Sequence, residues 1–330
     1  MARRGWERAG WSVAIGVPDA VAARLRRVLG AASRRVGTGP RPATGERIAH
    51  VDADGRSLRL AAAPRVALVK EDAQATVDAF LAVTAPHVSS EADTLAAAVA
   101  QDSWYHTIEL PGGMVTSGWF DHRPLLPYYG LPEDMSGSRA LDVGTADGFW
   151  AFEMERRGAE VVALELPRFG DRDFPPAAKR VIRSQADTPP GRRFELARRA
   201  LGSKVELVRL AIYDIEPSRL GSFDFVHAGD VLVHLRDPVG GLAAICSVTS
   251  GQAHIADAID PRLASGPGTD LNLAAYHGGW GVTTWWVPSV QTLAQMALDA
   301  GFADVEVRGM YRLDMREGPG PWRALLRARA

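Results

Sequence analysis

The stretch of sequence with the most chemical content joins an apolar run to a helical pattern through small residues. Residues 140–150 read ALDVGTADGFW. Gly144, Ala146 and Gly148 would let a cofactor approach the backbone closely at the end of a strand. Asp142 stands just inside that strand end, where it can orient the turn or accept a hydrogen bond from a cationic group. The pattern predicts a ligand site at this strand end, and an ordinary turn without ligand is the alternative.

A carboxylate closes the next apolar run. Residues 160–165 read EVVALE and end on Glu165. A carboxylate at the end of the second strand of a doubly wound sheet can accept from both ribose hydroxyls of a nucleoside. A dinucleotide motif needs a small residue where Phe149 stands, so its bulk disfavours a pyrophosphate site. The spacing Gly-x-Ala-x-Gly instead suits S-adenosylmethionine, a nucleoside with a cationic amino-acid tail.

Alternating strands and helices are expected to position these residues. Predicted strands cover 139–143, 160–165, 205–210, 223–228 and 254–257, and predicted helices cover about 147–157 and 238–248. This alternation predicts an α/β fold with a doubly wound, Rossmann-like, mostly parallel sheet. Ser289 is expected to cap a further helix that ends at Gly301. Closing strands at 305–307 and 322–326 are expected to pair antiparallel at the sheet edge.

Three segments are expected along the chain. Residues 138–330 form the cofactor-binding domain. Residues 104–137 form an aromatic connector that can fold over the strand ends and close the site. Residues 1–103 form a mostly helical N-terminal extension, with a hairpin over 48–60 and helices over about 21–32, 71–83 and 90–102, the last capped by Ser90.

Composition narrows the class of protein. The chain has 330 residues, a net charge of −1 and one cysteine, Cys246, so a disulfide framework and a polycationic coat for nucleic acid are excluded. The histidines lack the tight spacing of metal ligands, and we expect no metal. The apolar run 11–17 is short and the uncharged stretch 271–298 is interrupted by polar residues. We therefore expect a cytoplasmic protein without membrane contact.

Five stretches carry a resemblance to a known superfamily. They are LDVGTADG (141–148), VVALE (161–165), FDFVHAGDVLVHLRDP (223–238), WVPSVQTL (286–293) and AGF (300–302). The region from about 138 to 330 resembles the class I S-adenosylmethionine-dependent methyltransferases. Within that superfamily it is similar to the group of tRNA wobble-uridine carboxymethyltransferases, and the last three stretches are the more specific ones.

The resemblance implies where the cofactor would bind. Turn residues would lie along the methionine tail, the carboxylate after the second strand would hold the ribose, and the next residue would flank the adenine. Pairs after the third and fourth strands would complete the site, although the acid that relatives often place near the adenine amine is missing. The implied set is Asp142, Gly144, Thr145, Ala146, Gly148, Glu165, Leu166, Ala211, Ile212, Gly229 and Asp230.

One departure from the resembled group concerns the cofactor. Carboxymethyl-transferring members carry an aromatic hydroxyl just before the histidine that His234 matches, and this chain has Val233 there. The basic and aromatic residues before the first strand are only partly echoed, by residues 119–123. A carboxylated cofactor needs donors for its additional carboxylate. S-adenosylmethionine is therefore the expected cofactor, with carboxy-S-adenosylmethionine as the alternative.

Candidate catalytic residues lie on the acceptor side. A base is required only when the acceptor is a hydroxyl or a similar group. The candidates are His234, His106, His122 and Tyr105. A helix-start role for His234 and simple packing of the connector aromatics are the competing interpretations. An aromatic cluster over 276–286 could be an acceptor pocket, a stacking platform or packing, and His254 is expected to be a satisfied core residue.

The leading hypothesis is methyl transfer to a small molecule, for example in secondary metabolism. Modification of the tRNA wobble base is the first alternative, because residues 1–42 and 171–199 carry an excess of arginine and lysine that could bind RNA phosphates. A nicotinamide-dependent oxidoreductase and a non-catalytic binding module are the others. The N-terminal region could also mediate homo-oligomer formation.

Overall fold

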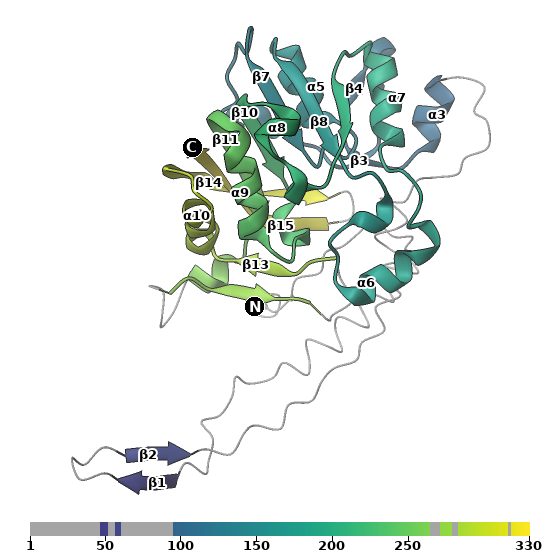
Figure 1. Ribbon diagram of the computed structural model, residues 1–330. Coiled ribbons are helices and arrows are strands. Elements are labelled where there is room, and N and C mark those ends of the chain that lie inside the picture. The colour runs from purple at the N-terminus through teal and green to yellow at the C-terminus, as the bar shows by residue number, and fades with distance from the viewer. Residues whose placement is uncertain (1–46, 52–56, 61–94, 265–270, 279–282, 316–317) are drawn as a thin grey trace, which may run out of the picture.

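The computed structural model describes residues 47–51, 57–60, 95–264, 271–278, 283–315 and 318–330. Its main feature is a nine-stranded sheet with the order β3-β6-β14-β15-β11-β10-β7-β8-β9 (Figure 1). Five neighbouring strands run parallel, and they are β7 (Arg139–Val143), β8 (Glu160–Glu165), β9 (Glu206–Arg209), β10 (Phe223–Gly229) and β11 (Thr249–Ala258). The predicted doubly wound, mostly parallel sheet is confirmed.

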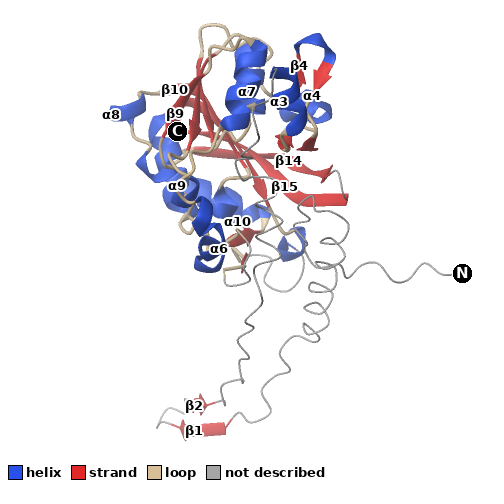
Figure 2. Cartoon of the chain, turned by 90° about the vertical axis from the view of Figure 1, so that its right-hand side faces the viewer, coloured by secondary structure: helices blue, strands red, loops and turns tan. Residues whose placement is uncertain are grey.

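Helices cover both faces of this sheet. One face packs against α3 (Leu95–Gln101), α5 (Phe149–Arg156) and α7 (Arg192–Leu201) through Ala140, Val161 and Ala163. The other face packs against α8 (Pro217–Leu220), α9 (Pro238–Val248) and α10 (Val290–Asp299) through Leu141, Val143 and Val162. Figure 2 shows α7 and α9 on opposite sides of the strands. Adjacent strand residues enter opposite cores because side chains alternate along a strand, which explains the continuous apolar runs in the sequence.

The closing strands are longer than expected. β14 (Asp304–Met315) and β15 (Gly318–Arg329) pair antiparallel, and β15 also pairs antiparallel with β11. The expected antiparallel pairing is confirmed, but the sheet does not end at this pair. Ser289 caps α10 by accepting a hydrogen bond from the Thr292 backbone N–H, as expected.

The connector adds strands to the sheet, which the sequence did not indicate. β3 (Trp104–His106) pairs parallel with β6 (Gly118–Phe120), and β6 meets β14 through one residue pair, Phe120 and Met315. Between them, β4 (Glu109–Leu110) and β5 (Met114–Val115) form a small hairpin, and α4 (Leu126–Tyr129) follows β6. The connector is therefore part of the sheet layer as well as a neighbour of the strand ends.

The remaining predictions concern the N-terminal region, and the remaining elements are short ones outside the main sheet. β1 (Arg47–Val51) and β2 (Ser57–Leu60) form the expected antiparallel hairpin. The predicted helices over 21–32 and 71–83, and Ser90 as a cap, lie outside the described residues. β12 (Ala274–Tyr276) pairs with β13 (Trp286–Pro288). The segment between β8 and α7, residues 166–191, is called the insertion, and it contains α6 (Pro176–Val181). In the part of the chain that the structure describes, every helix is too short or too polar to cross a membrane.

Candidate active site

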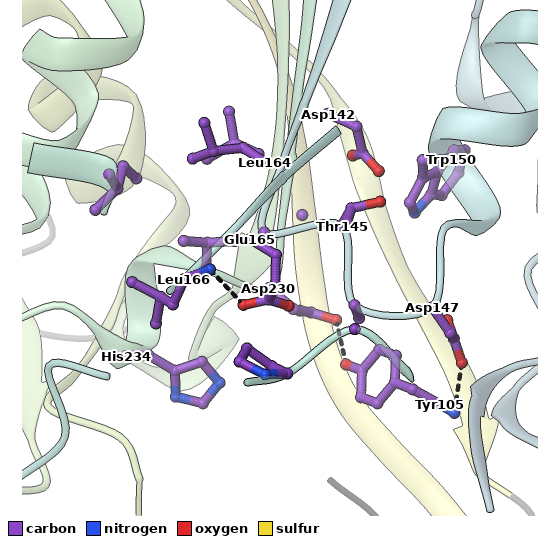
Figure 3. Close-up of a pocket in the computed structure, with 18 of the residues that line it drawn as sticks. Tyr105, Asp142, Thr145, Asp147, Trp150, Leu164, Glu165, Leu166, Asp230 and His234 are labelled. Atoms are coloured by element: carbon purple, nitrogen blue, oxygen red, sulfur yellow. Dashed lines mark hydrogen bonds between the residues drawn. The ribbon is translucent and has the colours of Figure 1, made fainter. Parts of the chain in front are cut away.

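A cavity of about 220 Å³ opens at the carboxyl ends of β7, β8 and β10. Ligands of open α/β sheets bind at this edge, so its position agrees with the fold. Its wall holds all but one of the residues that the sequence predicted as functional. These are Tyr105, His106, His122, Asp142, Gly144, Thr145, Ala146, Glu165, Leu166, Ala211, Ile212, Gly229, Asp230 and His234, several of which are labelled in Figure 3.

The turn after β7 brings backbone directly to the cavity. Gly144 has a φ of 72°, and a Cβ there would lie 2.6 Å from a methyl carbon of Val231. Ala146 adopts a φ of 54°, a left-handed conformation that costs a non-glycine residue roughly 1 kcal/mol. The Thr145 hydroxyl is buried and has no hydrogen-bond partner among the described residues. This turn combines a strained backbone with an unsatisfied donor, as expected of a ligand-binding loop.

Gly148 is the predicted site residue that does not line the cavity. It precedes α5 with a φ of 94°, and a Cβ there would lie 2.4 Å from a ring carbon of Phe152 and 2.8 Å from one of Phe194. The space beside Gly148 is filled by helix packing, so its expected contact with the cofactor is corrected to a structural role. The helix starts at Phe149 rather than at about 147.

Two carboxylates stand at the ends of neighbouring strands. Asp142 accepts a hydrogen bond from Nδ1 of His227 at 2.9 Å, while its Oδ2 has no partner within the described part of the chain. Glu165 ends β8, is 7% exposed and accepts from the Leu166 backbone N–H at 2.8 Å. Both side chains line the same cavity. A cationic group could meet Asp142 while a diol meets Glu165.

Asp230 is held by hydrogen bonds from two side chains, Arg323 and Tyr105, that lie far from it in the sequence. It follows β10 with a φ of 53°, and Nε of Arg323 donates to both of its oxygens at 2.7 and 2.9 Å. The Tyr105 hydroxyl donates to the same carboxylate at 3.1 Å. Burial opposes ionisation of Asp230, but Arg323 outweighs burial and the pKa of the carboxyl is lowered. Burial also raises the pKa of Tyr105 well above its usual range, so its hydroxyl keeps the proton.

Asp147 is a functional candidate that the sequence analysis missed. Its Oδ2 accepts from the backbone N–H of Tyr105 at 2.8 Å (Figure 3) and from that of His106 at 2.9 Å. Its Oδ1 contacts Nδ1 of His106. Asp147 thereby ties β3 to the turn after β7. Its position inside the GTADG motif was the available signal, but the partner lies 41 residues away in the sequence.

The other two candidate histidines are held in the neutral form. His122 is buried, and burial lowers its pKa well below the usual range. Its ring lies 5.1 Å from that of His106. His234 donates from Nδ1 to the Thr283 carbonyl at 2.9 Å, and burial again lowers its pKa. A neutral imidazole that donates from Nδ1 presents Nε2 as a proton acceptor.

Two further expectations are corrected or narrowed. His254 is buried as expected, but its Nδ1 has no hydrogen-bond partner among the described residues, so it is not a satisfied core residue. In the aromatic cluster, Trp285 is buried and its indole N–H donates to the Asp173 backbone carbonyl. The ring centroids of Tyr276 and Trp286 are 4.9 Å apart. None of these three aromatics lines the cavity. Trp285 packs in the interior, whereas Tyr276 is exposed. Trp280 lies outside the described residues.

Comparison with known proteins places the chain in a family. Residues 121–307 match the methyltransferase domain family, which covers more than half of the chain. A magnesium-protoporphyrin O-methyltransferase of Rhodobacter capsulatus is 31% identical over 33% of this chain and 38% of its own length. A tRNA U34 carboxymethyltransferase of Pseudomonas paraeruginosa is 28% identical over 52% of this chain and 47% of its own length.

The curated relatives are thus matched over about half of their length or less. Among solved structures, the N-terminal domain of EvdMO1 with SAH bound is 19% identical with a TM-score of 0.48, and the match covers 69% of this chain and 91% of that one. The family match begins just after β6 and ends within β14, so it contains most of the residues that line the cavity but not, among others, Tyr105, His106 or Tyr311. The chain belongs to the methyltransferase domain family.

Proposed function

We propose that this protein transfers a methyl group from S-adenosylmethionine to a small-molecule acceptor. The observation that carries the proposal is the cavity at the strand ends, where Glu165, the Gly144 turn and Asp142 meet. Family membership supports the reaction class. Two curated relatives, named magnesium-protoporphyrin O-methyltransferase and ubiquinone biosynthesis O-methyltransferase, support a small acceptor by their names.

The residues present fit such a cofactor. The unpartnered Oδ2 of Asp142 suits an ammonium group, and the unpartnered Thr145 hydroxyl suits a carboxylate or another acceptor of the amino-acid tail. Glu165 would hold the ribose hydroxyls, and Leu166, Ala211 and Ile212 would surround the adenine. When bound, the cofactor supplies a methyl carbon activated by its sulfonium.

The chain's own contribution to catalysis is alignment and, for a hydroxyl acceptor, proton removal. Nε2 of His234 or of His106 would take the acceptor proton, since each ring donates from Nδ1 to a protein oxygen. Asp147 would stabilise the imidazolium that forms on His106, whereas the Thr283 carbonyl offers His234 only a neutral partner. Buried Tyr105 keeps its proton and would act as a hydrogen-bond donor rather than as a base.

Calorimetry with S-adenosylhomocysteine tests the cofactor assignment. Wild-type protein should bind it, and Glu165→Gln should weaken binding by roughly tenfold or more, because a charged hydrogen-bond acceptor for the ribose is lost. Glu160→Gln, at the exposed opposite end of the same strand, is the matched control and should bind normally. Unchanged affinity in Glu165→Gln would reject this site.

A second candidate function has a specific observation behind it. Similarity to the tRNA U34 carboxymethyltransferase extends over 173 residues, the longest of the curated matches described above. Modification of a tRNA wobble uridine, with carboxy-S-adenosylmethionine as donor, is therefore the alternative proposal. A gel shift with tRNA that weakens with salt would favour it, and absence of a shift at low salt would dismiss it. Tighter calorimetric binding of the carboxylated cofactor than of S-adenosylmethionine would favour the carboxymethyl reaction.

A further inference from the structure

Three buried polar side chains that form part of the cavity wall are joined in a row by hydrogen bonds. Asp142 on β7, His227 on β10 and Tyr129 at the end of α4 are each 1% exposed. Nδ1 of His227 lies 2.9 Å from Oδ1 of Asp142, and Nε2 of the same ring lies 2.9 Å from the Tyr129 hydroxyl oxygen. The sequence analysis gave no role to His227 or Tyr129.

In this row of side chains, Tyr129 can donate to His227 and His227 can donate to Asp142. A carboxylate only accepts, so Nδ1 of His227 carries a proton and donates to Asp142. Nε2 of the ring can then accept from the Tyr129 hydroxyl. Burial raises the pKa of Tyr129 well above its usual range, so the hydroxyl retains the proton that it donates. All hydrogen bonding thus converges on one oxygen of Asp142 and leaves the other, Oδ2, facing its surroundings without a partner among the described residues.

Packing fixes the orientation of the His227 ring. Trp150 stacks on it with a centroid distance of 4.6 Å and an interplanar angle of 30°. Gly229 leaves the space that the ring occupies, since a Cβ there would lie 2.9 Å from Cε1 of His227. A ring held on its face, on its edge and at both nitrogens cannot swing away from Asp142. The rotamer of the carboxylate is fixed in turn.

We propose that His227, oriented by Tyr129, is a positioning residue that aims the second oxygen of Asp142 at the ammonium group of the cofactor's amino-acid tail. The inference rests on the proposed function, because it takes S-adenosylmethionine as the ligand. A buried carboxylate oxygen without a partner is costly, and an ammonium donor would satisfy it. A carboxylate free to rotate would lose part of this interaction.

Two ligands, one with and one without the amino-acid tail, can show whether His227 acts on the tail or only supports the fold. S-adenosylhomocysteine carries the ammonium group, whereas 5′-methylthioadenosine has the same nucleoside and no amino-acid tail. By calorimetry at pH 7.5, His227→Phe should weaken S-adenosylhomocysteine about tenfold and leave 5′-methylthioadenosine within about twofold. Glu165→Gln should instead weaken both ligands, since both contain the ribose.

The neighbouring strand offers a matched control. His254 pairs with His227 across the parallel strands β10 and β11, is also buried, and makes no described hydrogen bond to Asp142. His254→Phe should leave the affinities for both ligands unchanged. His227→Asn keeps an N–H donor near the position of Nδ1 and should retain S-adenosylhomocysteine affinity within about threefold. Tyr129→Phe should produce a smaller loss than His227→Phe, again confined to the ligand with the tail.

The outcomes are distinguishable. Equal weakening of both ligands in a folded His227→Phe variant, or no weakening of either, would overturn the positioning role. If His227→Phe fails to fold by circular dichroism, Tyr129→Phe and His227→Asn decide: a tail-selective loss in the first with retention in the second supports the proposal, and any other pattern rejects it. Wild-type protein that binds neither ligand would overturn the proposed cofactor itself.

Discussion

Three carboxylates around the cavity, of which Asp142 and Asp147 are buried and Asp230 is partly buried, are each paired with a side chain from a distant part of the sequence. Asp142 meets His227, Asp147 meets His106, and Asp230 meets Arg323. The sequence separations are 85, 41 and 93 residues. Asp142 and Asp230 could be identified from the sequence because Asp142 stands just inside the end of one strand and Asp230 directly follows another, but their partners come from tertiary packing. The positions of Glu165 and the Gly144 turn on the cavity wall were predictable because each stands directly at the end of a strand.

Removing one partner of the Asp230–Arg323 ion pair should destabilise the folded state more than removing both charges. Arg323 is 2% exposed, so Arg323→Met would leave Asp230 without its main partner and should cost about 3–5 kcal/mol in the free energy of unfolding. Arg323→Met combined with Asp230→Asn should recover much of that loss. Urea denaturation of the two variants measures the difference, and equal losses in both would contradict the account.

Arg308→Met is the control for the ion-pair prediction. Arg308 lies on the neighbouring strand β14 and pairs with Glu306 at the exposed surface. Exposed pairs contribute little to stability, so this variant should stay within about 0.5 kcal/mol of the wild type.

At the scale of elements, the alternating strands and helices of the parallel sheet were predictable and the added strands were not. Continuous apolar runs predicted β7, β8 and β10 because both faces of these strands are buried. β3 and β6 are three residues long, and β6 reaches the sheet through a single pair with Met315. Such short strands owe their position to contacts far along the chain, which no local period encodes.

The insertion after β8 is fastened to the rest of the site at Asp173. Its carboxylate accepts from the Tyr213 hydroxyl at 2.9 Å and from the Arg236 backbone N–H at 2.8 Å. The insertion has its own small core of Phe169, Phe174, Ala178 and Ile182, and Asp173 and Phe174 also line the cavity. Asp173 therefore joins a separately packed segment to the cavity rim.

Asp173→Ala should loosen this insertion and speed ligand release. The variant lacks the carboxylate that accepts from Tyr213 and Arg236. Its dissociation rate for S-adenosylhomocysteine should therefore rise roughly three- to tenfold in stopped-flow measurements, with a smaller change in the association rate. Asp187→Ala, at an exposed site of the same insertion, should leave both rates unchanged. Equal rates in wild type and Asp173→Ala would show that the insertion does not gate the cavity.

At the scale of the whole molecule, acid should destabilise the fold through His254. Burial, followed by the nearby His227, lowers the pKa of His254 to about 3, whereas an unfolded histidine titrates near 6.5. The folded state therefore binds fewer protons than the unfolded state between these values. The stabilisation is complete above about pH 6.5 and is lost as pH falls toward 3, with a slope of up to about 1.4 kcal/mol per pH unit.

His254→Phe isolates this effect because phenylalanine cannot take up the proton. Its free energy of unfolding should fall less than that of the wild type between pH 7.5 and pH 5, as measured by urea denaturation at both values. Parallel losses in the two proteins would place the acid sensitivity elsewhere in the molecule.

A crystal structure of the full chain grown with S-adenosylhomocysteine tests the central claim most directly. The account predicts the ligand at the carboxyl ends of β7, β8 and β10, with both ribose hydroxyls within hydrogen-bond distance of Glu165 and the tail ammonium beside Oδ2 of Asp142. Density for the ligand at any other place, or an unchanged cavity at saturating ligand, would contradict it.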